Sequence, residues 1–339
     1  MANPKNIAHI ESLRGIAALM VVFFHFISFS DGEKRLFESN LIRKISEFGA
    51  QGVEMFYIIS GFVMLVALKR SNYKIKEYLI YLTKRCIRIL PTYWLTILLI
   101  CTISFGLHRF LWGIPYDWNF RNIVTNATFT SDFFHRDWMN PIFITLKIEF
   151  QFYILIGLLF PLWNKNYFVK IIFIAVALTL TYISSDYNNI LKYLPYFLTG
   201  MITQEIYTNK NIKNITLLIL PLLFVLVFNS LDDISILIVT TLLIIYPLNY
   251  SKIITRIGEL SYSLYLTHGL SGGWILYFLH LHFGNKLNIL FLLMAVIISI
   301  LFALIINKTV EKPTLNLSQK IKYSMSLKLN LLQLIAKKK

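Results

Sequence analysis

Long apolar stretches, separated by short clusters of polar and charged residues, recur along almost the whole chain. A helix that crosses a bilayer needs about 20 mostly apolar residues, whereas a transmembrane β-barrel shows shorter segments of alternating polarity. The pattern therefore predicts an all-α integral membrane protein, a bundle of about ten transmembrane helices. The predicted spans are 11–30, 48–68, 88–107, 141–163, 167–185, 190–207, 214–231, 234–250, 257–279 and 287–307.

Composition and charge agree with this class. The chain is 56% apolar and 15% charged, against about 45–50% and about 25% in soluble domains. Its net charge of +16 comes from short clusters of Lys and Arg. Most of these residues lie on one side of the membrane if both termini are cytoplasmic, as the positive-inside rule requires. The charge therefore predicts topology and attraction to anionic lipid, and no nucleic-acid partner is expected.

The chain divides into residues 1–315, predicted as the transmembrane domain, and residues 316–339, predicted as a basic amphipathic cytoplasmic tail. Cys86 and Cys101 are too far apart along one helix to pair, at about 22 Å. His280 and His282 lack further metal ligands, so no metal site is predicted. The sequence holds no phosphate-binding loop, dinucleotide fingerprint or serine-elbow motif, and no tightly bound cofactor is expected.

Several ionisable residues lie within the predicted spans, where charge is expensive and commonly functional. Arg14 and His25 are 11 residues apart, which places them on one helix face about 16 Å apart. Counting residues from the span ends puts His25, Glu54 and Glu149 at a similar depth, about 9–12 Å below the outer surface. A carboxylate that orients His25 would make it a usable general base. The structural alternative is a histidine hydrogen-bonded to a neighbouring helix.

Two further sets carry candidate chemistry. Arg85 and Arg88 lie three residues apart on one helix face, where paired guanidinium groups suit phosphate oxygens. Topology-setting charge near lipid phosphate explains the same pair. Ser261, Tyr265 and His268 also share one face, and they either line a polar cavity or form hydrogen bonds between helices.

Six motifs in this order resemble the membrane acyltransferase-3 family, integral-membrane enzymes that O-acylate bacterial polysaccharides. The motifs span nearly the whole chain. They read IESLRGIAAL at 10–19 with His25 following, GVEMFYIISGF at 52–62, RCIRILPTYW at 85–94, LKIEFQFY at 146–153, SYSLYLTH at 261–268 and EKP at 311–313.

The resemblance implies ten transmembrane helices, a donor of the acetyl-CoA type on the cytoplasmic side, and an acceptor hydroxyl on an extracytoplasmic glycan. It implies that His25 and Glu149 are catalytic, with Glu54 a second choice for orienting His25. Glu54 stands where the family commonly shows Asp. The implied donor-binding residues are Arg14, Arg85 and Arg88, and the supporting residues are Glu54, Ser60, Tyr153, Tyr265 and His268. An appended hydrolase-like domain, which some members of the family carry, is not expected here, so transfer is expected to finish within the membrane domain.

The predicted protein is thus a multi-pass O-acetyltransferase of the bacterial cytoplasmic membrane. His25 either deprotonates the acceptor hydroxyl or carries the acyl group briefly. O-antigen, capsule, exopolysaccharide, peptidoglycan and small glycolipids all remain open as acceptors. Aromatic residues in the loop 107–140 either stack on sugars or anchor the interface: Trp112, Tyr116, Trp118 and Trp138. The alternatives are a non-enzymatic transporter of a glycolipid or small solute, and a sensor or assembly partner without turnover.

Overall fold

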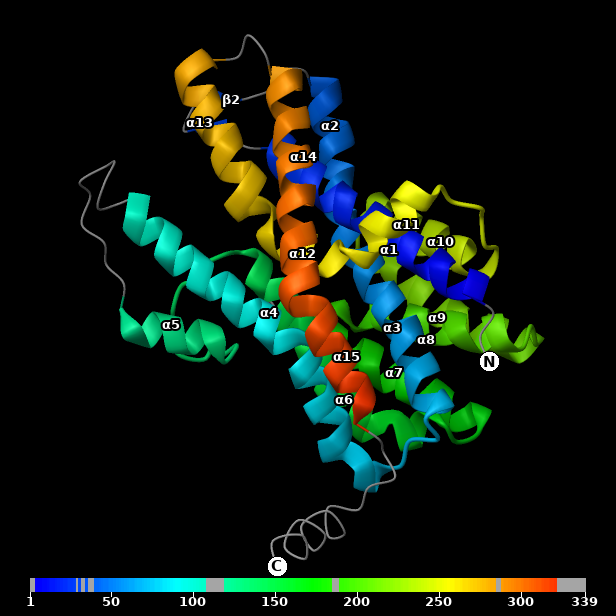
Figure 1. Cartoon of the computed structure of the whole chain (residues 1–339). Helices are drawn as coiled ribbons and strands as arrows, with labels where there is room; N and C mark the ends of the chain where they lie inside the picture. Colours follow the sequence, from blue (N-terminus) through cyan, green and yellow to red (C-terminus); the bar gives the residue numbers. More distant parts are fainter. Residues whose placement is uncertain are drawn as a thin grey trace, which may run out of the picture.

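A computed structural model describes residues 4–28, 30, 31, 34, 35, 40–107, 119–184, 189–284 and 288–321. The chain is helical over most of this length (Figure 1). Two short segments, β1 (Ser30–Asp31) and β2 (Lys34–Arg35), pair in antiparallel fashion. The helices are α1 (Pro4–Ile27), α2 (Asn40–Phe48), α3 (Gly52–Arg70), α4 (Tyr78–Leu107), α5 (Phe120–Ala127), α6 (Ile142–Trp163), α7 (Tyr167–Ile183), α8 (Ile190–Thr208), α9 (Ile212–Phe228), α10 (Leu231–Ile245), α11 (Lys252–Glu259), α12 (Ser261–His268), α13 (Trp274–Phe283), α14 (Asn288–Ile306) and α15 (Lys312–Lys320), with short 3-10 helices at Gly49–Gln51 and Ile75–Glu77.

Each of the ten predicted stretches contains helix. Within the described ranges, five helical segments are long and apolar enough to cross a membrane: Ala8–Ile27, Lys44–Arg70, Ile75–Gly106, Ile142–Trp163 and Asn288–Lys320. The chain is therefore an all-helical, multi-pass membrane protein. The count of ten spans and the cytoplasmic position of both termini stay predictions.

An apolar stripe on α14 shows which surface faces lipid. Ile289, Leu293, Ile297 and Leu301 recur every fourth residue and are 68, 50, 56 and 57% exposed. Residues spaced by four share one helix face. An apolar helix face that contacts lipid tails has no hydrophobic penalty, because it is not exposed to water. This stripe is therefore expected to face the lipid.

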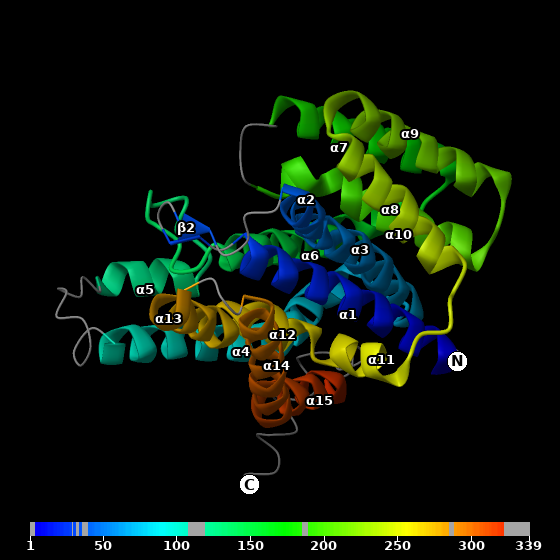
Figure 2. The same cartoon turned by 90° about the horizontal axis from the view of Figure 1, so that it is seen from above.

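Helix α3 lies at the centre of the bundle (Figure 2). Seen from above, α7–α10 form one side, α4 and α12–α15 the other, and α1, α3 and α6 lie between. Helices α3 and α8 touch through their backbones. A Cβ atom at Gly200 would lie 1.9 Å from the Ile58 carbonyl oxygen, and one at Gly61 would lie 2.2 Å from that of Phe197. Small residues allow such close approach in membranes.

A second close contact fixes the start of α1 against α11. A Cβ atom at Gly258 would lie 1.7 Å from the Glu11 carbonyl oxygen, and Ser12 and Thr255 share a hydrogen bond of 2.8 Å. Arg14 follows directly in this part of α1 and forms an ion pair of 3.3 Å with Glu11. The α1–α11 contact therefore holds the Arg14 side chain in place.

The helical stretch from α11 to α13 is interrupted twice. Leu260 separates α11 from α12, and a π-helical turn, Gly269–Gly273, joins α12 to α13. A second π-helical turn, Asn307–Glu311, joins α14 to α15. The span predicted at 257–279 is therefore helical over most of its length, but it is interrupted at Leu260 and contains a π-helical turn directly after His268.

The predicted boundary between residues 315 and 316 falls inside α15, which packs against α4. The Lys84 ammonium donates to the Ile321 carbonyl oxygen at 2.6 Å, at the end of this contact. Residues 322–339 of the predicted tail lie outside the described residues, as do Trp112, Tyr116 and Trp118.

Candidate active site

Two histidines from distant parts of the chain meet where α1 ends. His25 belongs to α1 and His268 ends α12, and their rings lie 5.0 Å apart between centroids. His25 Nδ1 is 3.1 Å from His268 Nε2. His25 is partly exposed, whereas His268 is fully buried. The prediction from the sequence gave His268 a supporting role but did not predict that it contacts His25.

Backbone carbonyl groups determine where the hydrogens of this pair reside. His268 Nδ1 is 2.8 Å from the Tyr265 carbonyl oxygen, and His25 Nδ1 is 2.9 Å from that of Val21. A carbonyl oxygen only accepts, so both Nδ1 atoms carry the hydrogen when the rings are neutral. His25 Nδ1 then donates to Val21 and His268 together. The Nε2 lone pair of His25 is left without a partner in the described part of the chain.

Glu149 does not orient His25 directly, contrary to the prediction from depth. Its carboxylate accepts from Ser60 Oγ at 2.7 Å and from the Tyr153 hydroxyl. Lys147, from the same helix, forms an ion pair with Asp132. Residue depth along a helix axis says nothing about the direction in which a side chain points, and Glu149 points toward the arginines described next.

Glu54, the second candidate for orienting His25, lies elsewhere. Its electrostatic neighbours are Asp233 and Lys192 on α10 and α8. Among the described residues it forms no hydrogen bond with His25. Glu54 therefore faces the side of α3 that packs against α8 and α10.

A narrow cavity of about 80 Å³, which we call the inner cavity, brings Arg14, Arg85 and Arg88 together. Glu149 is the carboxylate that lines it, so the lining carries more positive than negative charge. Arg85 lies over the rings of Tyr81 and Tyr153, with its guanidinium carbon 5.7 and 5.6 Å from their centroids. Neither Arg85 nor Arg88 forms an ion pair with a described residue. The full lining is Arg14, Val53, Phe56, Tyr57, Ile59, Ser60, Val63, Met64, Arg85, Arg88, Thr145, Leu146, Glu149, Tyr153, Ser261, Tyr262 and Tyr265.

Three buried polar atoms that line the inner cavity have no hydrogen-bond partner in the part of the chain that the structure describes: Arg85 Nε, the Tyr57 hydroxyl and Ser261 Oγ. A buried polar group without a partner is costly, and native structures rarely leave one unsatisfied. Three such groups around one cavity, beside two unpaired guanidinium groups, indicate a site for a polar anionic ligand or for ordered water.

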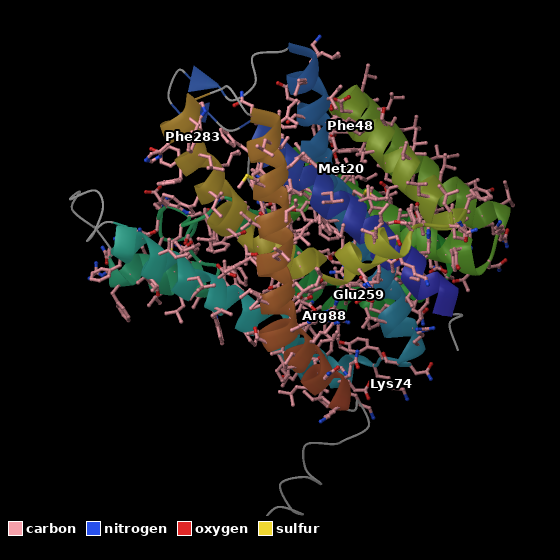
Figure 3. The ribbon with its side chains drawn as sticks, turned by 45° about the horizontal axis from the view of Figure 1, so that its top comes forward. Met20, Phe48, Lys74, Arg88, Glu259 and Phe283 are labelled. Atoms are coloured by element: carbon pink, nitrogen blue, oxygen red, sulfur yellow. The ribbon has the colours of Figure 1, made fainter. Side chains whose placement is uncertain are left out.

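A second cavity of about 300 Å³, the entrance cavity, shares Arg14, Arg88, Glu149 and Tyr153 with the inner cavity. It extends to Glu259 and to α15. Figure 3 shows Arg88 and Glu259 between Lys74 toward one end of the molecule and Phe48 and Phe283 at the other. Its remaining lining is Glu11, Ile89, Tyr262, Asn307, Glu311, Lys312 and Leu315.

A third cavity of about 440 Å³ lies in front of the histidine pair, and we call it the His25 cavity. It lies one helical turn beyond the inner cavity on two helices, since Thr145 and Tyr265 line the inner cavity and Ile142 and His268 line this one. A hydrogen bond between Thr145 and Tyr265 separates the two cavities. The lining is His25, Phe26, Asn140, Pro141, Ile142, His268, Gly269, Gly273, Trp274 and Tyr277.

A family model of the acyltransferase-3 type, described as an acyltransferase domain, matches residues 7–232, about two thirds of the chain. The chain belongs to this acyltransferase family. It is a membrane acyltransferase, and the match includes His25, the three arginines and Glu149. Tyr265 and His268 lie beyond the matched residues. No curated protein and no solved structure matches the chain.

The structure thus gathers most of the predicted site residues of this acyltransferase. Ser60, Tyr153 and Tyr265 surround the inner cavity with the arginines, while His25 and His268 form the adjoining pair. Sequence reasoning missed Asn140, Trp274 and Tyr277, which line the His25 cavity. They carry no distinctive spacing, and the cavity combines residues from three parts of the chain that are far apart in the sequence.

Proposed function

We propose that this acyltransferase moves an acetyl or similar acyl group from acyl-CoA to a hydroxyl of an extracytoplasmic cell-surface polysaccharide or glycolipid. The observation that carries the proposal is the row of cavities from Arg88, past Tyr265, to His25. The proposed setting is the bacterial cytoplasmic membrane, with both termini in the cytoplasm.

The arginine end of this row is the proposed donor site. Guanidinium groups bind phosphate oxygens through paired, charge-assisted hydrogen bonds. Arg85 and Arg88 are free of ion pairs among the described residues, so they need not release a carboxylate before binding. Arg14 lines both the inner and the entrance cavity and is ion-paired with Glu11, so its charge is already partly compensated.

The distance between the two ends favours a long donor. Arg14 and His25 are about 16 Å apart along α1. A donor held at the arginines must therefore carry its acyl group on an arm of that order, as CoA does. The unpartnered Tyr57 and Ser261 hydroxyls lie along the proposed path and suit polar groups of such an arm. The hydrogen bond between Thr145 and Tyr265 has to open for the acyl group to reach His25.

His25 Nε2 is the proposed base. Its lone pair takes the proton of the acceptor hydroxyl as the oxygen bonds to the thioester carbonyl carbon. Cleavage of the carbon–sulfur bond then releases the CoA thiolate, which takes that proton from Nε2. In the other route, Nε2 attacks the thioester carbonyl carbon and CoA leaves as the thiolate. The acceptor oxygen then attacks the carbonyl carbon of the acyl-imidazole, the carbon–Nε2 bond breaks, and the hydroxyl proton passes to the CoA thiolate. Both routes use the same lone pair.

The experiment that tests this function is transfer of radiolabelled acetyl from acetyl-CoA to cell-envelope glycan, in membranes that carry either the wild type or His25→Ala. We expect label in glycan with the wild type and its loss with His25→Ala at equal protein level and equal acetyl-CoA binding. Absence of both label and acetyl-CoA binding in the wild type contradicts the proposal. That result would favour a transporter, in which the intramembrane charges line a translocation pathway.

A further inference from the structure

The His25 cavity contains two glycines whose backbone does not require glycine. Gly269 has φ −63° and ψ −40°, and Gly273 has φ −62° and ψ −47°, which are ordinary helical values. A Cβ atom at Gly269 would meet nothing within 4 Å, and one at Gly273 would make only ordinary contacts of 3.8 and 3.9 Å. Both positions would accept a side chain, and a side chain there would occupy the cavity in front of His25.

Gly272, in the same π-helical turn, is different. A Cβ atom there would lie 2.3 Å from Ser299 Oγ and 2.4 Å from the Ala295 carbonyl oxygen. Gly272 is therefore needed for packing against α14, whereas Gly269 and Gly273 leave space. A π-helical turn of this kind is rare and is frequently found at functional sites.

The wall of the cavity combines an aromatic plane with polar edges. Trp274 is 38% exposed, and its indole N–H has no hydrogen-bond partner among the described residues. The Asn140 side-chain oxygen accepts from the Ile142 amide at 3.0 Å, which leaves its NH₂ group available. Phe26 and Ile142 supply apolar surface, and His25 Nε2 supplies an acceptor.

We propose that the His25 cavity binds one sugar ring of the acceptor, with Trp274 against an apolar face of the ring and Gly269 and Gly273 keeping the space open. This rests on the proposed function, whose acceptor hydroxyl must reach His25 Nε2. A pyranose has C–H faces that pack on an aromatic ring and hydroxyl edges that hydrogen-bond, which matches Trp274 beside Asn140 and His25. A ring-free alkyl alcohol would leave the Asn140 amide and the indole N–H unpaired.

The test measures protection of a cysteine placed in the cavity. Cys86 and Cys101, both free thiols, are replaced by Ser, and Gly269→Cys is introduced. Membranes open on both sides are treated with a small charged thiol reagent in the presence of methyl and octyl glycosides of glucose, galactose, mannose and N-acetylglucosamine. We expect at least one glycoside to slow labelling several-fold at saturation, and 1-octanol to have no such effect. Gly106→Cys, whose surroundings are also open, is the matched control and should show no protection.

Equal labelling with every glycoside, or equal protection by 1-octanol, would overturn the sugar site. Gly269→Leu provides a second measurement: it should abolish glycoside protection of Gly273→Cys while acetyl-CoA binding stays unchanged. If the wild type does not bind acetyl-CoA but glycosides still protect Gly269→Cys, the proposed donor is contradicted and the sugar site is retained. The two failures are therefore distinguishable.

Discussion

His268 Nε2 lies 3.1 Å from His25 Nδ1, although the two residues are 243 positions apart in the chain. Because Nδ1 of His268 faces the Tyr265 carbonyl oxygen, its Nε2 has to accept, and the hydrogen bonds run in one direction from His25 to α12. The sequence predicted that the Glu149 carboxylate orients His25. In the structure, a second imidazole and a backbone carbonyl group orient His25 instead. His268 is thus a positioning residue that fixes the tautomer and ring orientation of His25.

His268→Ala should therefore slow acyl transfer without weakening donor binding. Removal of the base itself, by His25→Ala, should slow transfer by about 10²–10⁴-fold. For His268→Ala we expect a smaller loss than this, but one of at least about 10-fold. His268→Gln should recover part of the rate, because its amide both accepts from His25 and donates to the Tyr265 carbonyl. The measurement is the transfer rate alongside the acetyl-CoA dissociation constant.

His282→Ala is the control for this series, since His282 is exposed and its ring contacts only its own helix, at Phe278. It should leave the rate unchanged. Equal rates for His268→Ala and the wild type would remove His268 from the mechanism, and a parallel loss of donor binding would indicate a merely structural role.

Helical segments and several candidate site residues could be predicted from the sequence. The length of an apolar stretch and the presence of a costly charge within it can both be read from neighbouring residues alone. Arg14, Arg85 and Arg88 indeed share a cavity. Spacing along one helix also correctly placed Ser261 and Tyr265 on a face that lines it.

The partner of His25 could not be predicted in this way. Counting residues gives the depth of a side chain on a straight, upright helix, but neither its rotation about the axis nor the tilt of the helix. Glu149 therefore does not have the predicted direction: it lines the inner cavity, and its carboxylate accepts from Ser60 and Tyr153. His268 was placed within one span, whereas the structure interrupts that helix at Leu260 and continues it after His268 as a π-helical turn.

The two unpaired arginines should control donor affinity. A hydrogen bond to a charged group contributes about 1.5–3 kcal/mol, so Arg85→Ala or Arg88→Ala should weaken acetyl-CoA binding by roughly 10- to 100-fold. Lysine at either position should recover only part of the loss, because it lacks the planar fork. Equilibrium binding to detergent-solubilised protein gives the dissociation constants.

A useful contrast is acetylpantetheine, which lacks the nucleotide phosphates of acetyl-CoA. Its binding should respond little to either substitution. Arg256→Ala serves as the control because Arg256 is exposed and lies outside the three cavities. If both donors lost affinity equally, the arginines would not be phosphate ligands.

Glu149→Gln separates two roles for the same carboxylate. The amide retains an oxygen that can accept from Ser60 and Tyr153, so the fold should persist. Removal of the negative charge beside three arginines should tighten acetyl-CoA binding by about 5- to 30-fold, since charges about 10 Å apart interact by on the order of 1–2 kcal/mol at an effective dielectric constant of about 20. A slower transfer rate with unchanged donor affinity would instead support the original assignment of Glu149 to His25.

The α3–α8 contact should be highly sensitive to a single added methyl group. Gly200→Ala would place its Cβ atom 1.9 Å from the Ile58 carbonyl oxygen, which belongs to backbone and cannot rotate away. Separation of the two helices would also move Ser60, which holds Glu149 from α3. Overpacking of this kind costs about 1–3 kcal/mol and occasionally more, so we expect a lower thermal unfolding temperature and weaker acetyl-CoA binding. Gly106→Ala, which meets nothing within 4 Å, should instead leave stability unchanged or raise it slightly, because alanine favours a helix over glycine by about 0.5–1 kcal/mol. Equal unfolding temperatures for the two variants would mean that α3 and α8 do not approach as closely in the membrane as in this structure.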